Sequence, residues 1–98
     1  MIHMSKQLSE SEKWEIIGFI KISPTRYEIL KTIDDDFMMP SEIARFTGLR
    51  ITQVSNALHD LKKKELVYCL NEQVSKGRLY QNTPLGLEIL KMIEKNKK

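Results

Sequence analysis

The chain has 98 residues, a formal net charge of +3 at pH 7, 41% hydrophobic residues, 30% charged residues and one cysteine. This length supports one domain, residues 1–98, with a modest core, and the composition is typical of a soluble globular protein. Because the chain has no apolar run of membrane-spanning length, no signal-peptide pattern and only Cys69 as a thiol, we expect a cytoplasmic protein without a membrane segment or disulfide.

The first predicted helix covers residues 9–22. Ser9 and Glu12 have the spacing of a capping box, which opens a helix. The apolar residues of this helix are spread around most of its circumference: Trp14, Ile16, Ile17, Phe19, Ile20 and Ile22. Such a helix needs cover on several sides, either from a second subunit or from a groove between other helices of the same chain.

A second helix is predicted to start at Ser23-Pro24, where serine serves as N-cap and proline takes the first helical position. Its buried stripe comprises Tyr27, Leu30 and Ile33. Three consecutive aspartates, residues 34–36, end it; they lack the alternating ligands and glycine of a calcium loop, so a solvated turn is expected. Phe37 to Met39 is expected to enter the core as a short extended segment.

The next two helices are predicted at residues 40–47 and 51–65, separated by Gly48 in a left-handed conformation. The first would pack through Ile43, Ala44 and Phe46. The second has apolar residues at steps of three and four: Ile51, Val54, Leu58 and Leu61. Uncharged hydrogen-bonding side chains lie between them: Thr52, Gln53, Ser55, Asn56 and His59. They suit base edges in a DNA groove, although an ordinary amphipathic core helix would show the same apolar pattern.

A β-hairpin is predicted after this helix. Residues 66–70 are rich in β-forming side chains, residues 71–77 are polar, and residues 78–82 form a returning strand. Lys76 and Arg78 lie near its tip. Thr83-Pro84 repeats the N-cap signature and opens a last helix, residues 84–95, with these apolar residues: Leu85, Leu87, Ile89, Leu90 and Ile93.

The charge is unevenly distributed along the chain. Residues 1–40 carry five Lys or Arg against seven Asp or Glu, residues 41–83 carry seven against four, and residues 84–98 carry four against two. The basic excess begins with the helix at residues 40–47, which favours a nucleic-acid partner for this part of the protein.

Residues for catalysis or metal binding are scarce. The chain contains two histidines and one cysteine, without a nucleophile–base spacing, a glycine-rich phosphate loop or a metal-ligand quartet. Cys69 lies in the middle of a predicted strand, without a neighbouring base to lower its pKa, which favours a packed structural thiol. We therefore expect a protein that is not an enzyme and needs no cofactor.

Four stretches in chain order cover about residues 23–90: Ser23-Pro24-x-Arg26-x-x-Ile29-Leu30, Pro40-Ser41-Glu42-Ile43-Ala44-x-x-x-Gly48-Leu49, Val54-Ser55-Asn56-x-Leu58-x-x-Leu61 with Leu66-Val67, and Gly77-Arg78-x-Tyr80-x-x-Thr83-x-x-Gly86. Together they resemble the winged helix-turn-helix regulators of the MarR and ArsR type, particularly small archaeal ones. The resemblance implies a mainly α fold with a small β-hairpin wing (α+β). The core would span about residues 23–83, and the flanking helices 9–22 and 84–95 would form a dimer.

The chain departs from this family pattern at two positions. Arg50 stands where a serine or threonine usually caps the recognition helix, which weakens the cap by about 1 kcal/mol but places a cation where a phosphate could lie. Asn82 replaces an apolar residue before Thr83, and a polar side chain there is expected to disturb the packing of the second wing strand.

The resemblance implies a sequence-specific regulator of transcription that binds double-stranded DNA as a homodimer, most simply a repressor. Base edges in the major groove would be read by Thr52, Gln53, Ser55 and Asn56. The phosphate backbone or minor groove would meet Arg50, His59, Lys62, Lys63, Lys76 and Arg78. For His59 a plain solvated position fits equally well, and part of the run Lys62 to Lys64 would complement the helix dipole.

The dimer interface implied by the terminal helices comprises Trp14, Ile17, Phe19, Ile20, Leu87 and Leu90. The sequence indicates no small-molecule effector. A second function stays open, because one fold hosts many functions: a winged-helix module that binds protein partners without specific DNA binding. Such a module would expose apolar residues in place of the polar set at residues 52–56.

Overall fold

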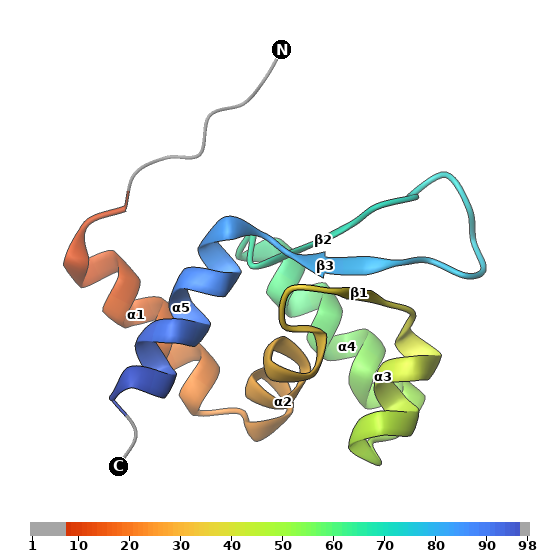
Figure 1. Cartoon of the computed structure of the whole chain (residues 1–98), viewed down its shortest axis with the longest axis horizontal. Helices are drawn as coiled ribbons and strands as arrows, with labels where there is room; N and C mark the ends of the chain where they lie inside the picture. The colour runs from red at the N-terminus through yellow and green to blue at the C-terminus, as the bar shows by residue number, and fades with distance from the viewer. Residues whose placement is uncertain (1–7, 97–98) are drawn as a thin grey trace.

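The structure is a computed structural model that describes residues 8–96. Within this range the chain forms five helices and three short strands (Figure 1). In chain order they are α1 (Glu10–Lys21), α2 (Pro24–Ile33), β1 (Phe37–Met38), α3 (Pro40–Thr47), α4 (Ile51–Lys63), β2 (Val67–Cys69), β3 (Tyr80–Asn82) and α5 (Pro84–Lys95). The predicted order of elements is confirmed, with α4 two residues shorter than expected.

The helix boundaries follow the local signals in the sequence. Ser9 Oγ accepts the Glu12 amide at 3.1 Å, while Glu12 Oε1 accepts the Ser9 amide at 2.8 Å, which completes the capping box of α1. Thr83 Oγ1 accepts the Gly86 amide at 3.0 Å and caps α5 in the same way. Gly48 ends α3 with a φ of 78°, a conformation that glycine adopts without steric cost.

The core is organised around α2, which packs against all four other helices. In Figure 1 the helices α1 and α5 lie side by side at one end, and the hairpin extends from the other end. Ile29, Leu30 and Ile33 of α2 are fully buried, whereas Tyr27, expected in the same stripe, is only half-buried. No helix in residues 8–96 is both long and apolar enough to cross a membrane.

The sheet has three antiparallel strands in the order β1-β3-β2. Phe37 pairs with Gln81 and Met38 with Tyr80, so the short segment after α2 extends the hairpin by an edge strand. Two expectations about this region are wrong. Phe37 is 49% exposed because it lies on the edge strand, and Phe46 is 70% exposed because the narrow inward stripe of α3 is occupied by Ile43 and Ala44.

The start of α5 is packed directly against the turn that follows α4. A Cβ atom added to Gly86 would stand 2.2 Å from the Leu66 carbonyl oxygen, so only glycine fits at this crossing. The Thr83 amide donates to the same Leu66 oxygen at 3.0 Å, and Thr83 Oγ1 donates to the Glu65 oxygen at 2.7 Å. These contacts fix where the hairpin leaves the helical core.

Asn82 stabilises the fold instead of disturbing it. Its side chain is buried, with 4% exposure, and Nδ2 donates to the Leu30 oxygen at 3.1 Å and the Asp34 oxygen at 2.8 Å. Both carbonyls belong to the C-terminal end of α2; the Leu30 oxygen also accepts the Asp34 amide at 2.9 Å, whereas the Asp34 oxygen lies beyond the last helical turn. The expectation that a polar residue here disturbs the strand is therefore wrong, because this amide caps a helix.

Candidate nucleic-acid interface

The outer face of α4 is exposed along its first two turns. All four residues expected to read bases have exposed side chains there: Thr52, Gln53, Ser55 and Asn56. The opposite face packs into the core through Val54, Ala57, Leu58 and Leu61. Ile51, expected in the buried stripe, is 48% exposed because it starts the helix beyond the edge of the core.

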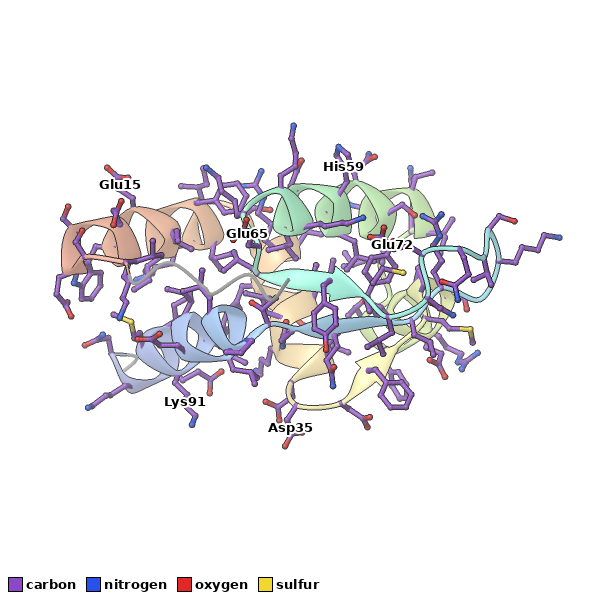
Figure 2. The ribbon with its side chains drawn as sticks, turned by 90° about the horizontal axis from the view of Figure 1, so that it is seen from above. Glu15, Asp35, His59, Glu65, Glu72 and Lys91 are labelled. Atoms are coloured by element: carbon purple, nitrogen blue, oxygen red, sulfur yellow. The ribbon has the colours of Figure 1, made fainter. Side chains whose placement is uncertain are left out.

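Figure 2 shows how this face lies relative to the rest of the molecule. His59 projects outward from α4, whereas Asp35 and Lys91 lie on the opposite side. The outer face of α4 is therefore open to a large partner, and His59 is exposed at its middle.

The connection between α3 and α4 holds α4 at a defined angle. Thr47 Oγ1 donates to the Ile43 oxygen at 2.7 Å and accepts the Leu49 amide at 3.2 Å. Together with the left-handed Gly48, these two bonds fix the tight turn between the helices. Helix, tight turn and exposed second helix make up a helix-turn-helix unit.

At the start of α4 only the reciprocal half of a capping box is formed. Because a guanidinium has no hydrogen-bond acceptor, the exposed Arg50 side chain cannot cap the helix. Instead, the amide carbonyl of Gln53 accepts the Arg50 backbone N–H, with 3.0 Å between Oε1 and N. Gln53 therefore has a structural contact that the sequence analysis did not anticipate.

The basic residues at the end of α4 have different environments. Lys62 forms an ion pair with Glu72 of the hairpin, and their hydrogen bond raises the pKa of Lys62 and lowers the pKa of Glu72. The Lys64 ammonium lies 5.4 Å from the centre of the Phe19 ring. Lys63 is exposed to solvent, and within residues 8–96 it pairs neither with Glu72 nor with the Phe19 ring.

The hairpin loop is held together by its own side chains. Arg78 Nε donates to the Val74 oxygen at 2.7 Å and Nη2 donates to the Glu72 oxygen at 3.1 Å. Asn71 Nδ2 donates to the Gly77 oxygen at 3.1 Å. Two N–H groups of Arg78, a residue expected to contact DNA, therefore already donate to carbonyls of the loop. Lys76 is exposed at the tip. The sequence could not reveal the bonds of Arg78, because the acceptors are carbonyls that only the folded loop brings together.

The residues expected at a dimer interface divide into two groups. Ile17, Ile20 and Leu90 are core residues of the single chain, with exposures of 3%, 0% and 6%. They are buried because α1 packs against α2 and α5, where Lys13 Nζ lies 2.7 Å from Glu88 Oε2. Their assignment to an exposed interface is corrected accordingly.

The other three expected interface residues remain partly accessible: Trp14, Phe19 and Leu87. Trp14 is 49% exposed, and the neighbouring helix end leaves Ile22 77% exposed. Phe19 is half-covered by the Arg26 guanidinium, 3.9 Å from the ring centre. The sequence allows two ways to cover the apolar residues of α1, a groove within the chain or a second subunit. The groove between α2 and α5 covers the inner side of α1, and the outer side keeps exposed apolar residues.

Metal ligands do not gather anywhere in residues 8–96, where no group of three His, Cys, Asp or Glu side chains could hold an ion. Cys69 is a buried free thiol whose Sγ donates to Asn71 Oδ1 at 3.5 Å. This position agrees with the expected structural thiol.

No family model and no curated protein sequence matches the chain. Several solved structures are similar to it in fold. TubR from Bacillus thuringiensis serovar israelensis pBtoxis, bound to 24 bp of tubC, has a TM-score of 0.77 at 15% identity, over 95% of this chain and 100% of that chain. HlyU from Vibrio cholerae has a TM-score of 0.69 at 14% identity, over 91% and 96%. MepR from S. aureus, in a DNA complex, has a TM-score of 0.67 at 19% identity, over 87% and 73%.

The chain has a winged helix-turn-helix fold. In this fold α3 and α4 form the helix-turn-helix, with α4 as its second helix, and the loop between β2 and β3 is the wing. The match with TubR extends over nearly the whole chain, so α1 and α5 are included in the similarity.

Proposed function

We propose that the protein is a transcriptional regulator of the MarR or ArsR type that binds double-stranded DNA sequence-specifically, with α4 in the major groove. The observation that carries this proposal is the exposed face of the first two turns of α4, whose side chains beyond Ile51 are all uncharged hydrogen-bonding groups. Such groups can exchange hydrogen bonds with base edges. The DNA complexes of TubR and MepR support the proposal, because both proteins share the fold.

The roles follow from position. Thr52, Gln53, Ser55 and Asn56 would meet base edges. Backbone contacts would come from exposed side chains around them: Arg50, His59, Lys63 and Lys76. Lys62 and Arg78 would contribute less, since Glu72 neutralises the first and carbonyls of the wing engage the second. This function needs neither a catalytic group nor a cofactor.

The proposed regulator acts in the cytoplasm as a homodimer, most simply as a repressor that blocks access to a promoter. The exposed apolar surface of α1, centred on Trp14 and Ile22, supports a second subunit at this end of the molecule. Because α1 and α5 lie at the opposite end from the wing, dimerisation there leaves both wings free (Figure 1).

A second candidate function is supported by another surface. Phe37 and Phe46 are exposed and line the same groove, of about 550 Å³, between β1 and α3. Exposed aromatic rings beside polar side chains, here Thr32, Asp36 and Glu42, are typical of protein-binding surfaces, so a module for protein–protein interaction is the alternative. DNA binding distinguishes the two functions.

The test is a selection from random-sequence duplexes with the purified protein, followed by salt titration of the enriched sequence. We expect the logarithm of the association constant to fall linearly with the logarithm of the salt concentration, with a slope of about −0.9 per neutralised phosphate. Asn56→Ala should relax sequence preference, whereas Lys76→Ala should weaken binding to all sequences alike. Absent or salt-insensitive binding to every duplex would refute DNA recognition.

A further inference from the structure

The groove between β1 and α3, of about 550 Å³, combines aromatic and acidic side chains. We call it the β1–α3 groove, and these residues line it: Thr32, Asp36, Phe37, Met38, Glu42 and Phe46. The two rings are the side chains most open to a partner, because Phe37 is 49% and Phe46 is 70% exposed. Glu42 is four residues before Phe46 in α3, so these two side chains lie on the same face of that helix.

The two carboxylates of the β1–α3 groove keep acceptor capacity for a partner. Asp36 Oδ1 accepts the Phe37 amide at 2.8 Å, and Glu42 Oε1 accepts the Met39 amide at 2.8 Å. Within residues 8–96 neither carboxylate makes another hydrogen bond or pairs with a Lys or Arg side chain. The groove therefore carries two negative charges that the described part of the chain does not neutralise.

The surroundings of the groove do not supply the missing positive charge. Asp34 and Asp35 precede Asp36 and are exposed, so the negative potential extends beyond the groove. Arg45 follows Glu42 by three positions in α3, but it does not line the groove and forms no ion pair with Glu42 in the structure. An anionic partner such as a nucleic acid would be repelled here, whereas a cationic one would be attracted.

A guanidinium group suits both features of the groove. It stacks on aromatic faces and donates through a planar fork of N–H groups that matches a carboxylate, whereas an ammonium group is a compact and strongly hydrated charge. The protein contains the same combination between its own helices. The Arg26 guanidinium lies 3.9 Å from the centre of the Phe19 ring, and its Nη2 lies 3.3 Å from Asp60 Oδ2.

We propose that the β1–α3 groove binds an arginine-containing segment of a partner protein, with the guanidinium against the exposed rings and its N–H groups on Asp36 and Glu42. This inference goes beyond the proposed DNA binding and does not depend on it. Asp35, next to the groove, lies on the side of the molecule opposite to His59 of α4 (Figure 2). The partner protein and the DNA would therefore occupy different faces.

The probe for this site is a peptide obtained by selection. A display library of random short peptides would be selected on the full-length protein, and an enriched peptide would be synthesised with arginine and with citrulline, which has a similar shape and no charge. We expect arginine in the enriched sequences and peptide-induced chemical-shift changes at residues 36–38 and 42–46. Citrulline should weaken binding by at least about tenfold in fluorescence anisotropy, because it removes the charge from the hydrogen bonds.

Three substitutions test the groove from the side of the protein. Asp36→Asn and Glu42→Gln remove a charge and retain an oxygen for the backbone N–H, so the local structure is kept. Each should weaken binding of the arginine peptide about three- to fivefold at low salt. Phe46→Leu, which removes the ring and retains an apolar side chain, should weaken it about threefold. Asp35→Asn removes an equal charge beside the groove and is the matched control, with an expected change below about twofold.

Equal losses in Asp35→Asn and Asp36→Asn would mean general attraction to the acidic segment and would overturn the inference. So would enriched peptides without arginine, chemical-shift changes confined to other surfaces, or the absence of any enriched peptide. A second copy of the chain in the groove is a distinct outcome. Phe46→Leu would then reduce the mass in sedimentation without any peptide, whereas a site for a partner protein leaves that mass unchanged.

Discussion

At the scale of single residues, environment decides what a side chain does, and two asparagines illustrate this. Asn82 and Asn96 both donate to carbonyls at the end of a helix, Asn82 to Leu30 and Asp34, and Asn96 to Met92 at 2.9 Å. Asn82 is buried, whereas Asn96 is exposed. Water can replace the bond of Asn96, but it cannot easily reach the buried bond between Asn82 and the Leu30 carbonyl.

Replacement of Asn82 by alanine should therefore lower the free energy of unfolding by about 1–2 kcal/mol, because the Asp34 carbonyl loses its donor and the Leu30 carbonyl keeps only the Asp34 amide. The matched change Asn96→Ala should alter it by less than about 0.5 kcal/mol, as is usual for surface positions. Urea denaturation followed by circular dichroism measures both. Equal effects of the two substitutions would mean that the Asn82 bonds do not contribute to stability.

The residue scale also shows what sequence can reveal about the interface. The exposure of Thr52 to Asn56 follows from helical periodicity, because the apolar positions fix which side faces inward. The bond from the Arg50 amide to Gln53 has the three-residue spacing of half a capping box, so the sequence could have indicated it. The bonds of Arg78 could not be predicted, because only the folded loop brings their carbonyl acceptors together.

At the scale of elements, the strongest geometric constraint is the crossing of α5 over the turn between α4 and β2. Gly86 lies at this crossing, and Gly18 in α1 has open space where a Cβ atom would stand. The two glycines have the same helical setting and opposite surroundings, so they form a natural pair for comparison.

The change Gly86→Ala should destabilise the protein by about 3 kcal/mol or more, since the new methyl group would overlap the Leu66 carbonyl oxygen. Gly18→Ala should instead increase stability by up to about 1 kcal/mol, the usual difference in helix propensity. Thermal unfolding of both variants beside the wild-type protein is the measurement. A Gly86→Ala protein as stable as the wild type would contradict the close approach of α5.

The contact between α4 and the wing gives a further prediction at this scale. Glu72 neutralises Lys62, and its carboxylate lies on the side of the molecule proposed to face DNA. The pKa of Glu72 is lowered in the folded protein by the hydrogen bond and charge of Lys62. The ion pair is thus complete above the ordinary carboxyl pKa and is lost as the pH falls through the lowered value.

We expect Glu72→Gln to strengthen DNA binding about threefold near neutral pH at low salt, because Lys62 is released and a negative charge is removed beside the phosphates. The advantage should shrink as salt is added. Glu15→Gln, which removes an equal charge from α1, is the control and should have little effect (Figure 2). Fluorescence anisotropy with one labelled duplex measures both, and equal gains would show that only net charge matters.

Element prediction from sequence succeeds where a capping signal accompanies a periodic pattern, as at Ser9, Ser23 and Thr83. For β1 it gives a short extended segment but misses the pairing, because two residues contain no readable period and the partner strand, β3, lies far along the chain. The exposed positions of Phe37 and Phe46 follow from the same limitation, because an apolar side chain does not itself indicate which side of an element is covered.

At the scale of the whole molecule, the apolar pattern of the sequence indicates which helices pack together. Which apolar side chains remain exposed, and so can contact a second subunit, is seen only in the folded chain. The apolar residues of α1 appeared equivalent in the sequence. In the fold, Ile17 and Ile20 complete the core, whereas Trp14 and Ile22 remain exposed. Helix α1 lies at the end of the molecule opposite the wing (Figure 1). Of the large apolar side chains of α1 and its C-cap, Trp14 and Ile22 are the exposed ones, so we propose the dimer contact on this part of the surface.

This surface leads to a prediction about assembly. In sedimentation at micromolar concentration the wild-type protein should have twice the monomer mass of 11.5 kDa, and a variant with both Trp14→Ala and Ile22→Ser should sediment as the monomer. Phe46→Ala, which removes a 70% exposed ring from α3, is the control and should leave the dimer intact.

Because a dimer engages two half-sites at once, loss of the dimer should weaken binding to a palindromic duplex by about 100-fold and binding to a single half-site hardly at all. A wild-type protein that sediments only at 11.5 kDa would refute the assignment of this surface.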